Sequence, residues 1–164
     1  MLRAGAVIVI ALLAGCSSAP PLPRAPAARV PVERAVEDRS RAGERITDHA
    51  LAMLGVPYRY GGDRPETGFD CSGLVYYSYS MSGFSVPRTS QEQFRAARKI
   101  GLADLERGDV MFFQDQEKLS HVGIYVGERR FVHAPASGRT VSLASLDSPY
   151  YQRNLVAVGR LLPD

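Results

Sequence analysis

One cysteine and two histidines have the residue types and the order that a thiol-dependent acyl-transfer enzyme needs. Cys71 lies in "TGFDCSGLV", His121 opens "HVGIYVG", and His133 lies in "FVHA". A thiol nucleophile needs an imidazole base, and that imidazole needs a polar group that fixes its orientation. These three residues could therefore act as nucleophile, general base and orienting group.

The residues around Cys71 predict a helix that begins at the cysteine. Asp70 can cap a helix over "DCSGLVYYSYSMSG", which Gly83 would end. Free backbone N–H groups and the positive end of the helix dipole meet in the first turn, and both favour a thiolate over a thiol. We therefore expect Cys71 to be anionic and reactive. The residues expected to face inward are Leu74, Val75 and Tyr79.

The two histidines are predicted to lie on neighbouring strands of one hairpin. His121 and Gly123 share a face of the first strand, because side chains alternate along a strand. If Val126 pairs with Arg130 through a three-residue loop at 127–129, or an equivalent bulged register forms, His133 lies opposite Gly123 and diagonal to His121. Gly123 would then leave the space for the imidazole ring. A four-residue loop without a bulge would place His133 on the wrong face.

A metal site and a redox site are the competing uses of these residue types. Zinc ligands usually occur as close pairs such as CxxC or HxxxH. Cys71, His121 and His133 are instead separated by fifty and twelve residues, and "CSGL" has no second cysteine for a redox pair. We expect no metal and no organic cofactor.

The order of the remaining elements indicates an α+β fold with N-terminal helices packed on an antiparallel sheet of about five strands. Helices are expected within 43–55, 70–83 and 87–99. Thr89 or Ser90 would cap the third helix, and Ser90 with Gln93 fits a capping box. Helices followed by period-two segments favour α+β over an alternating parallel sheet. The expected strands are 110–113, 121–126, 130–134, 140–143 and 154–162.

The N-terminal residues have the pattern of a bacterial lipoprotein signal. Residues 4–13 form an apolar run that is too short to span a bilayer. "LAGC" resembles a lipobox, in which the cysteine, here Cys16, is acylated and exposed by cleavage. Ser17, in place of aspartate, favours the outer membrane. We expect a protein anchored by lipid to the periplasmic face of the bacterial outer membrane.

Composition divides the 164 residues into three parts. We assign 1–15 to a lipoprotein signal peptide, 16–43 to a lipidated Pro/Ala/Arg-rich tether, and 44–164 to one folded domain. From residue 46 onward thirteen Lys and Arg balance thirteen Asp and Glu, so the domain lacks the charge excess of a nucleic-acid-binding fold. The basic excess lies in the N-terminal part, where it suits anionic lipid headgroups.

Six motifs in a fixed order resemble a known family. "GVPYRYGG", "FDCSGLV", "VPRTSQEQ", "LERGDVMFF", "HVGIYVG" and "FVHAP" are similar to motifs of the NlpC-type cysteine peptidases of the bacterial cell wall. The resemblance runs from about residue 46 to residue 162. With the lipobox, the chain looks most like the lipid-anchored murein endopeptidases of the outer membrane. The resemblance implies a papain-like core.

The resemblance also implies an activity and a set of site residues. The activity is hydrolysis of amide bonds in peptidoglycan stem peptides, at a D-Ala–diaminopimelate or a D-Glu–diaminopimelate bond. Cys71 would be the nucleophile, His121 the general base and His133 the group that orients it. Residues near the oxyanion or the substrate would be Tyr58, Asp70, Ser72, Arg88 and Ser90, although helix capping explains the last two equally well. An amidase or acyltransferase on the same fold and a non-catalytic wall-binding lipoprotein remain alternatives.

Overall fold

A computed structural model of the chain describes residues 32–115 and 118–163. The predicted signal peptide, the lipidation site at Cys16 and the first half of the predicted tether lie outside the described residues. None of the described helices is long and apolar enough to cross a bilayer. The helices are α1 (Val32–Leu51), α2 (Cys71–Met81), α3 (Ser90–Ala96), the 3-10 turn η1 (Leu102–Asp104) and α4 (Pro149–Asn154).

Within the described residues, six strands form one antiparallel sheet in the order β3-β8-β4-β5-β6-β7. A separate two-stranded ribbon, β1 (Asp63–Arg64) and β2 (Gly68–Phe69), leads into α2. The α+β prediction is confirmed, and each of the five expected strands is present. The sheet strands are β3 (Arg98–Ile100), β4 (Val110–Asp115), β5 (Lys118–Gly127), β6 (Arg130–His133), β7 (Ser142–Ser145) and β8 (Leu155–Arg160).

The edge strand β3 is the sixth strand, and the sequence assigned its first residues to a helix. Helix α3 ends at Ala96, and Arg98, Lys99 and Ile100 pair with β8. Three residues are too few for an alternating strand pattern to be recognised, so the predicted helix was extended into them. The pairing with β8 decides the conformation here.

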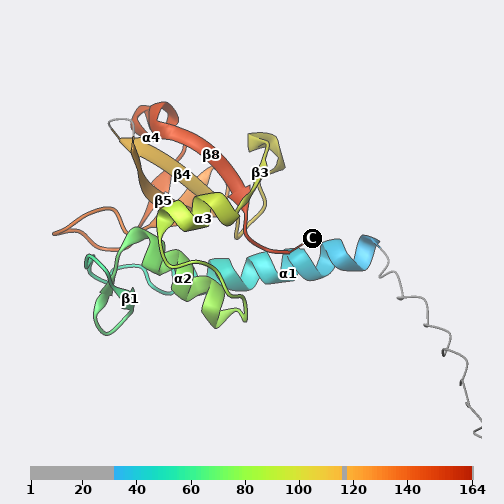
Figure 1. The fold of residues 1–164 in the computed structure, drawn as a ribbon, viewed down its shortest axis with the longest axis horizontal. Coiled ribbons are helices and arrows are strands. Elements are labelled where there is room, and N and C mark those ends of the chain that lie inside the picture. The colour runs from blue at the N-terminus through green and yellow to red at the C-terminus, as the bar shows by residue number, and fades with distance from the viewer. Residues whose placement is uncertain (1–31, 116–117, 164) are drawn as a thin grey trace, which may run out of the picture.

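Helices α1 and α2 pack against one face of the sheet (Figure 1). Ile46 from α1 and Leu74 from α2 are fully buried in the same cluster as Val122 and Ile124 of β5. The hydroxyl of buried Tyr79 donates a hydrogen bond to the carbonyl of Gly108 at 2.7 Å, which fixes α2 along its length. The position of the α2 N-terminus relative to β5 is therefore set by the core.

Helix α1 begins at Val32, so the expected boundary between tether and domain at residue 44 is wrong for the described part. Ala42 and Gly43 are buried, and a side chain at Gly43 would overlap the carbonyl of Arg107. No proline follows Pro31 in this segment, and its apolar residues recur at helical spacing toward Ile46. The tether was assigned from composition, in which the prolines before residue 32 outweighed the helical spacing of the apolar residues after it.

The hairpin of β5 and β6 has the predicted bulged register. Ile124 pairs with Val132, and a bulge before Gly127 shifts the pairing so that Gly127 meets Arg130. In this register His133 comes opposite Gly123, and Gly127 adopts a positive φ of 93°. One detail is wrong: a Cβ at Gly123 would lie 2.6 Å from a ring carbon of Phe131, so Phe131 rather than the imidazole fills that space.

Candidate active site

Cys71 occupies the first position of α2, as predicted. Asp70 is the N-cap, and its Oδ1 accepts a hydrogen bond from the Gly73 N–H at 2.6 Å. Its Oδ2 accepts another from the Gly61 N–H at 2.9 Å, which ties the preceding loop to the start of the helix. Leu74, Val75 and Tyr79 are fully buried, so the predicted inward face is confirmed.

The guanidinium of Arg88 holds this helix start together. It donates to both Asp70 carboxylate oxygens, at 2.9 and 3.0 Å, and to the Gly62 carbonyl at 3.0 Å. The Ser72 hydroxyl donates to Asp70 at 3.1 Å and accepts from Arg88 at 3.1 Å. Burial raises the pKa of Asp70, but the hydrogen bonds from Arg88, Gly73 and Gly61 outweigh burial and lower it. The carboxylate is therefore ionised and internally bound.

The third helix is capped by Thr89 with Glu92, so the expected capping box of Ser90 and Gln93 is wrong. Gln93 is fully buried and donates to the carbonyls of Ser72, at 3.0 Å, and Pro87, at 2.8 Å. This side chain connects α3 to the turn that carries the nucleophile. Both patterns fit the sequence, because Thr and Ser are adjacent and Glu and Gln are equivalent in a capping box.

The sulfur of Cys71 lies against β5. The backbone N–H of Val122, the residue after His121, faces it. Burial raises the pKa of the Cys71 thiol, and the nearby Asp70 carboxylate adds to this effect. The N–H groups of Val122, Ser72 and Cys71 itself act in the opposite direction but do not overcome burial. The expected resting thiolate is therefore wrong: the helix start favours it, and burial prevails.

The two imidazoles meet directly. Nε2 of His121 lies 2.8 Å from Nδ1 of His133. Burial, and then His133, lowers the pKa of His121 to about 3, while burial, and then Arg139, lowers the pKa of His133 to about 4. Both rings are therefore neutral near pH 7. Their contact places His133 where it can orient His121.

Neutral rings also fix the direction of the hydrogen bonds. If Nδ1 of His121 is to accept the thiol proton, its Nε2 carries hydrogen and donates to Nδ1 of His133. Nε2 of His133 then carries hydrogen and faces the hydroxyl of Tyr151, 3.5 Å away. Tyr151 lies in α4, packs edge-on against His133, and was not predicted. A Ser-Pro pair before "YYQRN" is the available signal for this helix.

Two hollows flank these groups. One, of about 500 Å³, is lined by all the predicted residues near the nucleophile, namely Tyr58, Asp70, Cys71, Ser72, Arg88 and Ser90. The other, of about 530 Å³, is lined by His121, His133 and Tyr151. Ser120 lines both, so they join beside His121. Burial raises the pKa of Tyr58, with contributions from Cys71 and Asp70, so its hydroxyl stays protonated and can donate.

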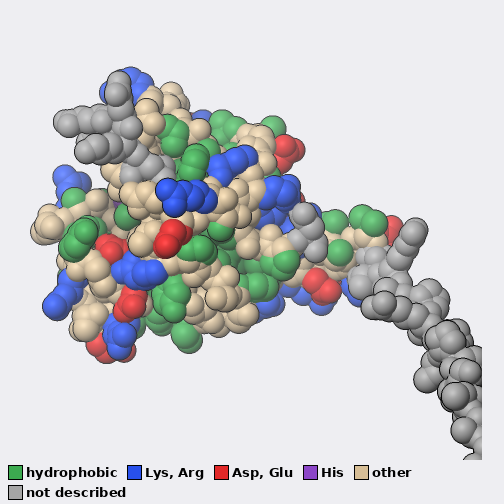
Figure 2. All heavy atoms as spheres, in the orientation of Figure 1, with side chains coloured by type: hydrophobic (Ala, Val, Ile, Leu, Met, Phe, Trp, Pro, Cys, Tyr) green, Lys and Arg blue, Asp and Glu red, His purple; other side chains and the backbone are tan. Residues whose placement is uncertain are grey.

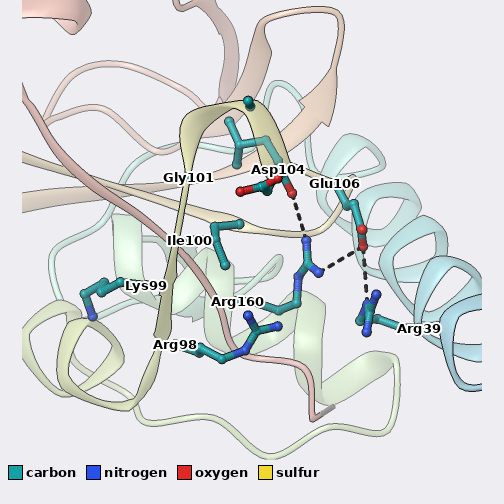
Figure 3. Close-up of a pocket in the computed structure, with 10 residues that line it drawn as sticks. Arg39, Arg98, Lys99, Ile100, Gly101, Asp104, Glu106 and Arg160 are labelled. Carbon is teal, nitrogen blue, oxygen red and sulfur yellow. Dashed lines mark hydrogen bonds and ion pairs between the residues drawn. The ribbon is translucent and has the colours of Figure 1, made fainter. Parts of the chain in front are cut away.

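A third hollow lies elsewhere and is lined by residues of an ion-pair network (Figure 3). Its volume is about 720 Å³, and Arg160 projects into it. That guanidinium binds both oxygens of buried Asp109, at 2.8 and 2.7 Å, and pairs with Glu106 at 3.2 Å. Glu106 also pairs with Arg39 of α1. These contacts hold α1 to the sheet and carry no nucleophile.

No group of three metal-ligating side chains occurs among residues 32–115 and 118–163. Lysine, arginine, aspartate and glutamate are interspersed over the face shown in Figure 2.

The candidate site consists of a thiol, two neutral imidazoles and a buried carboxylate-guanidinium pair.

Comparison with known proteins places this geometry in a family. The sequence profile of the NlpC/P60 family matches residues 55–160. The chain belongs to the NlpC/P60 family. It is 41% identical over 117 residues to the murein DD-endopeptidase MepH of Escherichia coli, which covers 68% of this chain and 43% of MepH. It is 42% identical over 121 residues to the bifunctional muramidase/DL-endopeptidase CwlT of Bacillus subtilis, covering 72% of this chain and 36% of CwlT.

A solved structure agrees with the sequence comparison. The peptidoglycan hydrolase RipB of Mycobacterium tuberculosis superposes with a TM-score of 0.66 at 28% identity, covering 83% of this chain and 74% of that structure. The matched region spans less than half the length of MepH and of CwlT. The shared part is thus the NlpC/P60 domain, which in this chain contains Cys71, His121 and His133.

Proposed function

We propose that this NlpC/P60 protein is a cysteine peptidase that hydrolyses amide bonds in peptidoglycan stem peptides. The observation that carries the proposal is the convergence of three side chains from separate elements. The Cys71 sulfur at the start of α2 faces the backbone N–H of Val122, next to His121, and His121 contacts His133 at 2.8 Å. The names of MepH, CwlT and RipB support peptidoglycan as the substrate class.

The reaction begins with a neutral thiol and a neutral imidazole. Nδ1 of His121 removes the thiol proton as the Cys71 sulfur bonds to the carbonyl carbon of the substrate. The backbone N–H of Cys71 and the protonated hydroxyl of Tyr58 are the donors for the oxyanion. The imidazolium of His121 then gives its proton to the leaving amine, and a thioester remains on Cys71.

Deacylation uses the same groups in reverse. His121 takes a proton from water as the water oxygen attacks the thioester carbonyl, and the sulfur leaves and recovers the proton. His133 accepts the hydrogen bond from Nε2 of His121 and stabilises the imidazolium in both half-reactions. No cofactor takes part in either step.

The bond that is cleaved lies at diaminopimelate in this proposal, either D-Ala–diaminopimelate or D-Glu–diaminopimelate. The name of MepH refers to a DD bond and that of CwlT to a DL bond, so both alternatives have a precedent among the relatives. An amidase or acyltransferase would share the three catalytic residues and would release different products. A wall-binding protein without activity would release none.

Full-length wild-type protein incubated with purified sacculi tests the activity. We expect soluble stem-peptide fragments whose masses identify the cleaved bond, and no fragments with Cys71→Ala. Ser80→Ala is the matched control, because Ser80 is an exposed residue of the same helix and the substitution removes one polar atom of a small side chain, as Cys71→Ala removes the sulfur. Circular dichroism checks that all three proteins fold. Equal digestion by wild type and Cys71→Ala would refute nucleophilic catalysis by this sulfur.

We also propose that Cys16 carries the lipid anchor and that the enzyme acts from the periplasmic face of the outer membrane. The support is the sequence pattern alone: an apolar run followed by "LAGC" and Ser17. Mass analysis of the N-terminal peptide should find acyl groups on Cys16. Cys16→Ala should lose them and leave the membrane fraction, and an unmodified Cys16 in membrane-bound wild type would contradict the assignment.

A further inference from the structure

The hollow beside the two histidines has no role in the reaction as derived so far. It adjoins the nucleophile's hollow at Ser120 and is lined by both imidazoles. In acyl transfer by a thiol, the carbonyl-side residue bonds to sulfur, and the amine-side residue leaves with a proton from the imidazole. The amine-side residue must therefore lie next to His121, which places it in the histidine-side hollow.

Arg139 supplies this hollow with a positive charge. Its side chain lines the hollow together with Gln114, Tyr150 and Tyr151. In the part of the chain that the structure describes, no carboxylate pairs with its guanidinium, in contrast to Arg88, whose guanidinium is bound to Asp70. Its charge acts inside the site. Burial lowers the pKa of His133 and Arg139 adds to this effect, while for Tyr151 burial raises the pKa and Arg139 opposes the rise.

The backbone of Arg139 is held in place although its side chain is exposed. Its carbonyl accepts a hydrogen bond from the N–H of Tyr58 at 2.8 Å, and its N–H donates to the Ala136 carbonyl at 3.1 Å. The next residue, Thr140, forms a bridge with Pro57. The loop after β6 is thus attached to the loop that carries Tyr58, on the nucleophile side. The backbone that carries this guanidinium is therefore held beside the cleft.

We propose that the histidine-side hollow binds the amine-side residue of the substrate and that Arg139 pairs with a free carboxylate on that residue. This inference rests on the proposed function and specifies its substrate class. Diaminopimelate keeps a carboxylate that lysine lacks, because the carbon that bears its second amine also bears a carboxyl group. The aromatic faces of Tyr150 and Tyr151 would contact its aliphatic chain. Stem peptides with an amidated diaminopimelate, or with lysine, would be poor substrates.

Two synthetic stem peptides test the inference, identical except that the amine-side diaminopimelate carries a carboxylate in one and a carboxamide in the other. Wild type should cleave the carboxylate form with a kcat/KM at least about tenfold higher, the effect of a hydrogen bond between charged groups. Arg139→Gln should lose this preference through KM and cleave the carboxamide form as wild type does. Arg139→Lys should recover part of the preference, since lysine keeps the charge without the planar fork.

Arg153→Gln is the matched control, because it removes the same charge from an exposed position of α4 that does not line the hollow. It should keep the full preference. Equal cleavage of both peptides by wild type, or an equal loss on both peptides in Arg139→Gln, would overturn the inference and leave the peptidase activity standing. No cleavage of either peptide by wild type, or of sacculi, would overturn both proposals.

Discussion

The protonation state of Cys71 makes a sharp prediction about its chemistry in the absence of substrate. An unperturbed thiol, with a pKa of about 8.5, is about 3% thiolate at pH 7. Burial raises the pKa of Cys71 above its ordinary value, so its thiolate fraction is smaller still. Because His121 has a pKa lowered to about 3, no imidazolium is present near neutral pH to hold a thiolate. The resting pair should be a thiol and an imidazole.

Alkylation by iodoacetamide measures this state directly, because the reagent is uncharged and reacts with the thiolate. For a thiol with a raised pKa the rate should increase about tenfold for each pH unit between about pH 6 and 8, in proportion to the thiolate fraction. The peptide that contains Cys71 is followed by mass spectrometry, so that Cys16 does not contribute. His121→Gln should keep nearly the same slope, since a neutral imidazole contributes little to the resting ionisation of the sulfur.

A thiolate-imidazolium pair would give a different profile. Its alkylation rate would be constant from about pH 5 to 8, and the plateau would disappear in His121→Gln. A plateau of that kind would refute the argument that burial outweighs the helix start at Cys71. The steady-state pH profile cannot replace this assay, because both states carry one proton on the pair and give the same bell-shaped curve.

Three further outcomes follow from the same contacts. Because the pKa of His121 is lowered to about 3 and that of His133 to about 4, kcat/KM should stay constant down to about pH 5 and fall below it, where the rings become protonated. A decrease centred near pH 6.5 would contradict these lowered pKa values. Tyr151→Phe removes the hydroxyl that faces His133, so kcat should fall about two- to tenfold with KM unchanged. A lower free energy of unfolding with unchanged kcat would show that Tyr151 has only a packing role. Asp109→Ala leaves the buried Arg160 without its main partner and should lower the free energy of unfolding, measured in urea, by about 3–5 kcal/mol. A decrease below about 1 kcal/mol would show that the ion pair with Glu106 is enough to compensate the charge of Arg160.

The positions of the three proposed catalytic residues could be predicted because each one depends on a local rule. Asp70 before Cys71 is an N-cap pattern, and caps are set by residues within one turn. The bulged hairpin that aligns His133 with His121 depends on a glycine turn and on alternation along two short strands. Local rules of this kind do not require knowledge of the rest of the fold.

The residues that sequence reasoning missed act across long separations. Tyr151 reaches His133 from a six-residue helix, and Gln93 reaches the carbonyl of Ser72 across twenty-one positions. Strand β3 exists because it pairs with β8, about sixty residues later. A short segment shows little hydrophobic periodicity, so its secondary structure and its contacts are decided by residues far away in the sequence. The local sequence pattern does not contain this information.

The ionisation of Cys71 failed as a prediction for a further reason, and the reason bears on catalysis. The helix start was read correctly, but a local rule gives no weight to burial against β5. The backbone N–H groups of Ser72 and Val122 point at the sulfur, yet a neutral thiol is a weak acceptor and gains little from them. As His121 withdraws the proton, the sulfur becomes a strong acceptor and the same N–H groups bind it more tightly. Their stabilisation is thus available in the transition state and largely absent in the resting state, which is the condition under which a contact accelerates a reaction. A resting thiol is also less open to oxidation than a thiolate, because oxidants react with the anion.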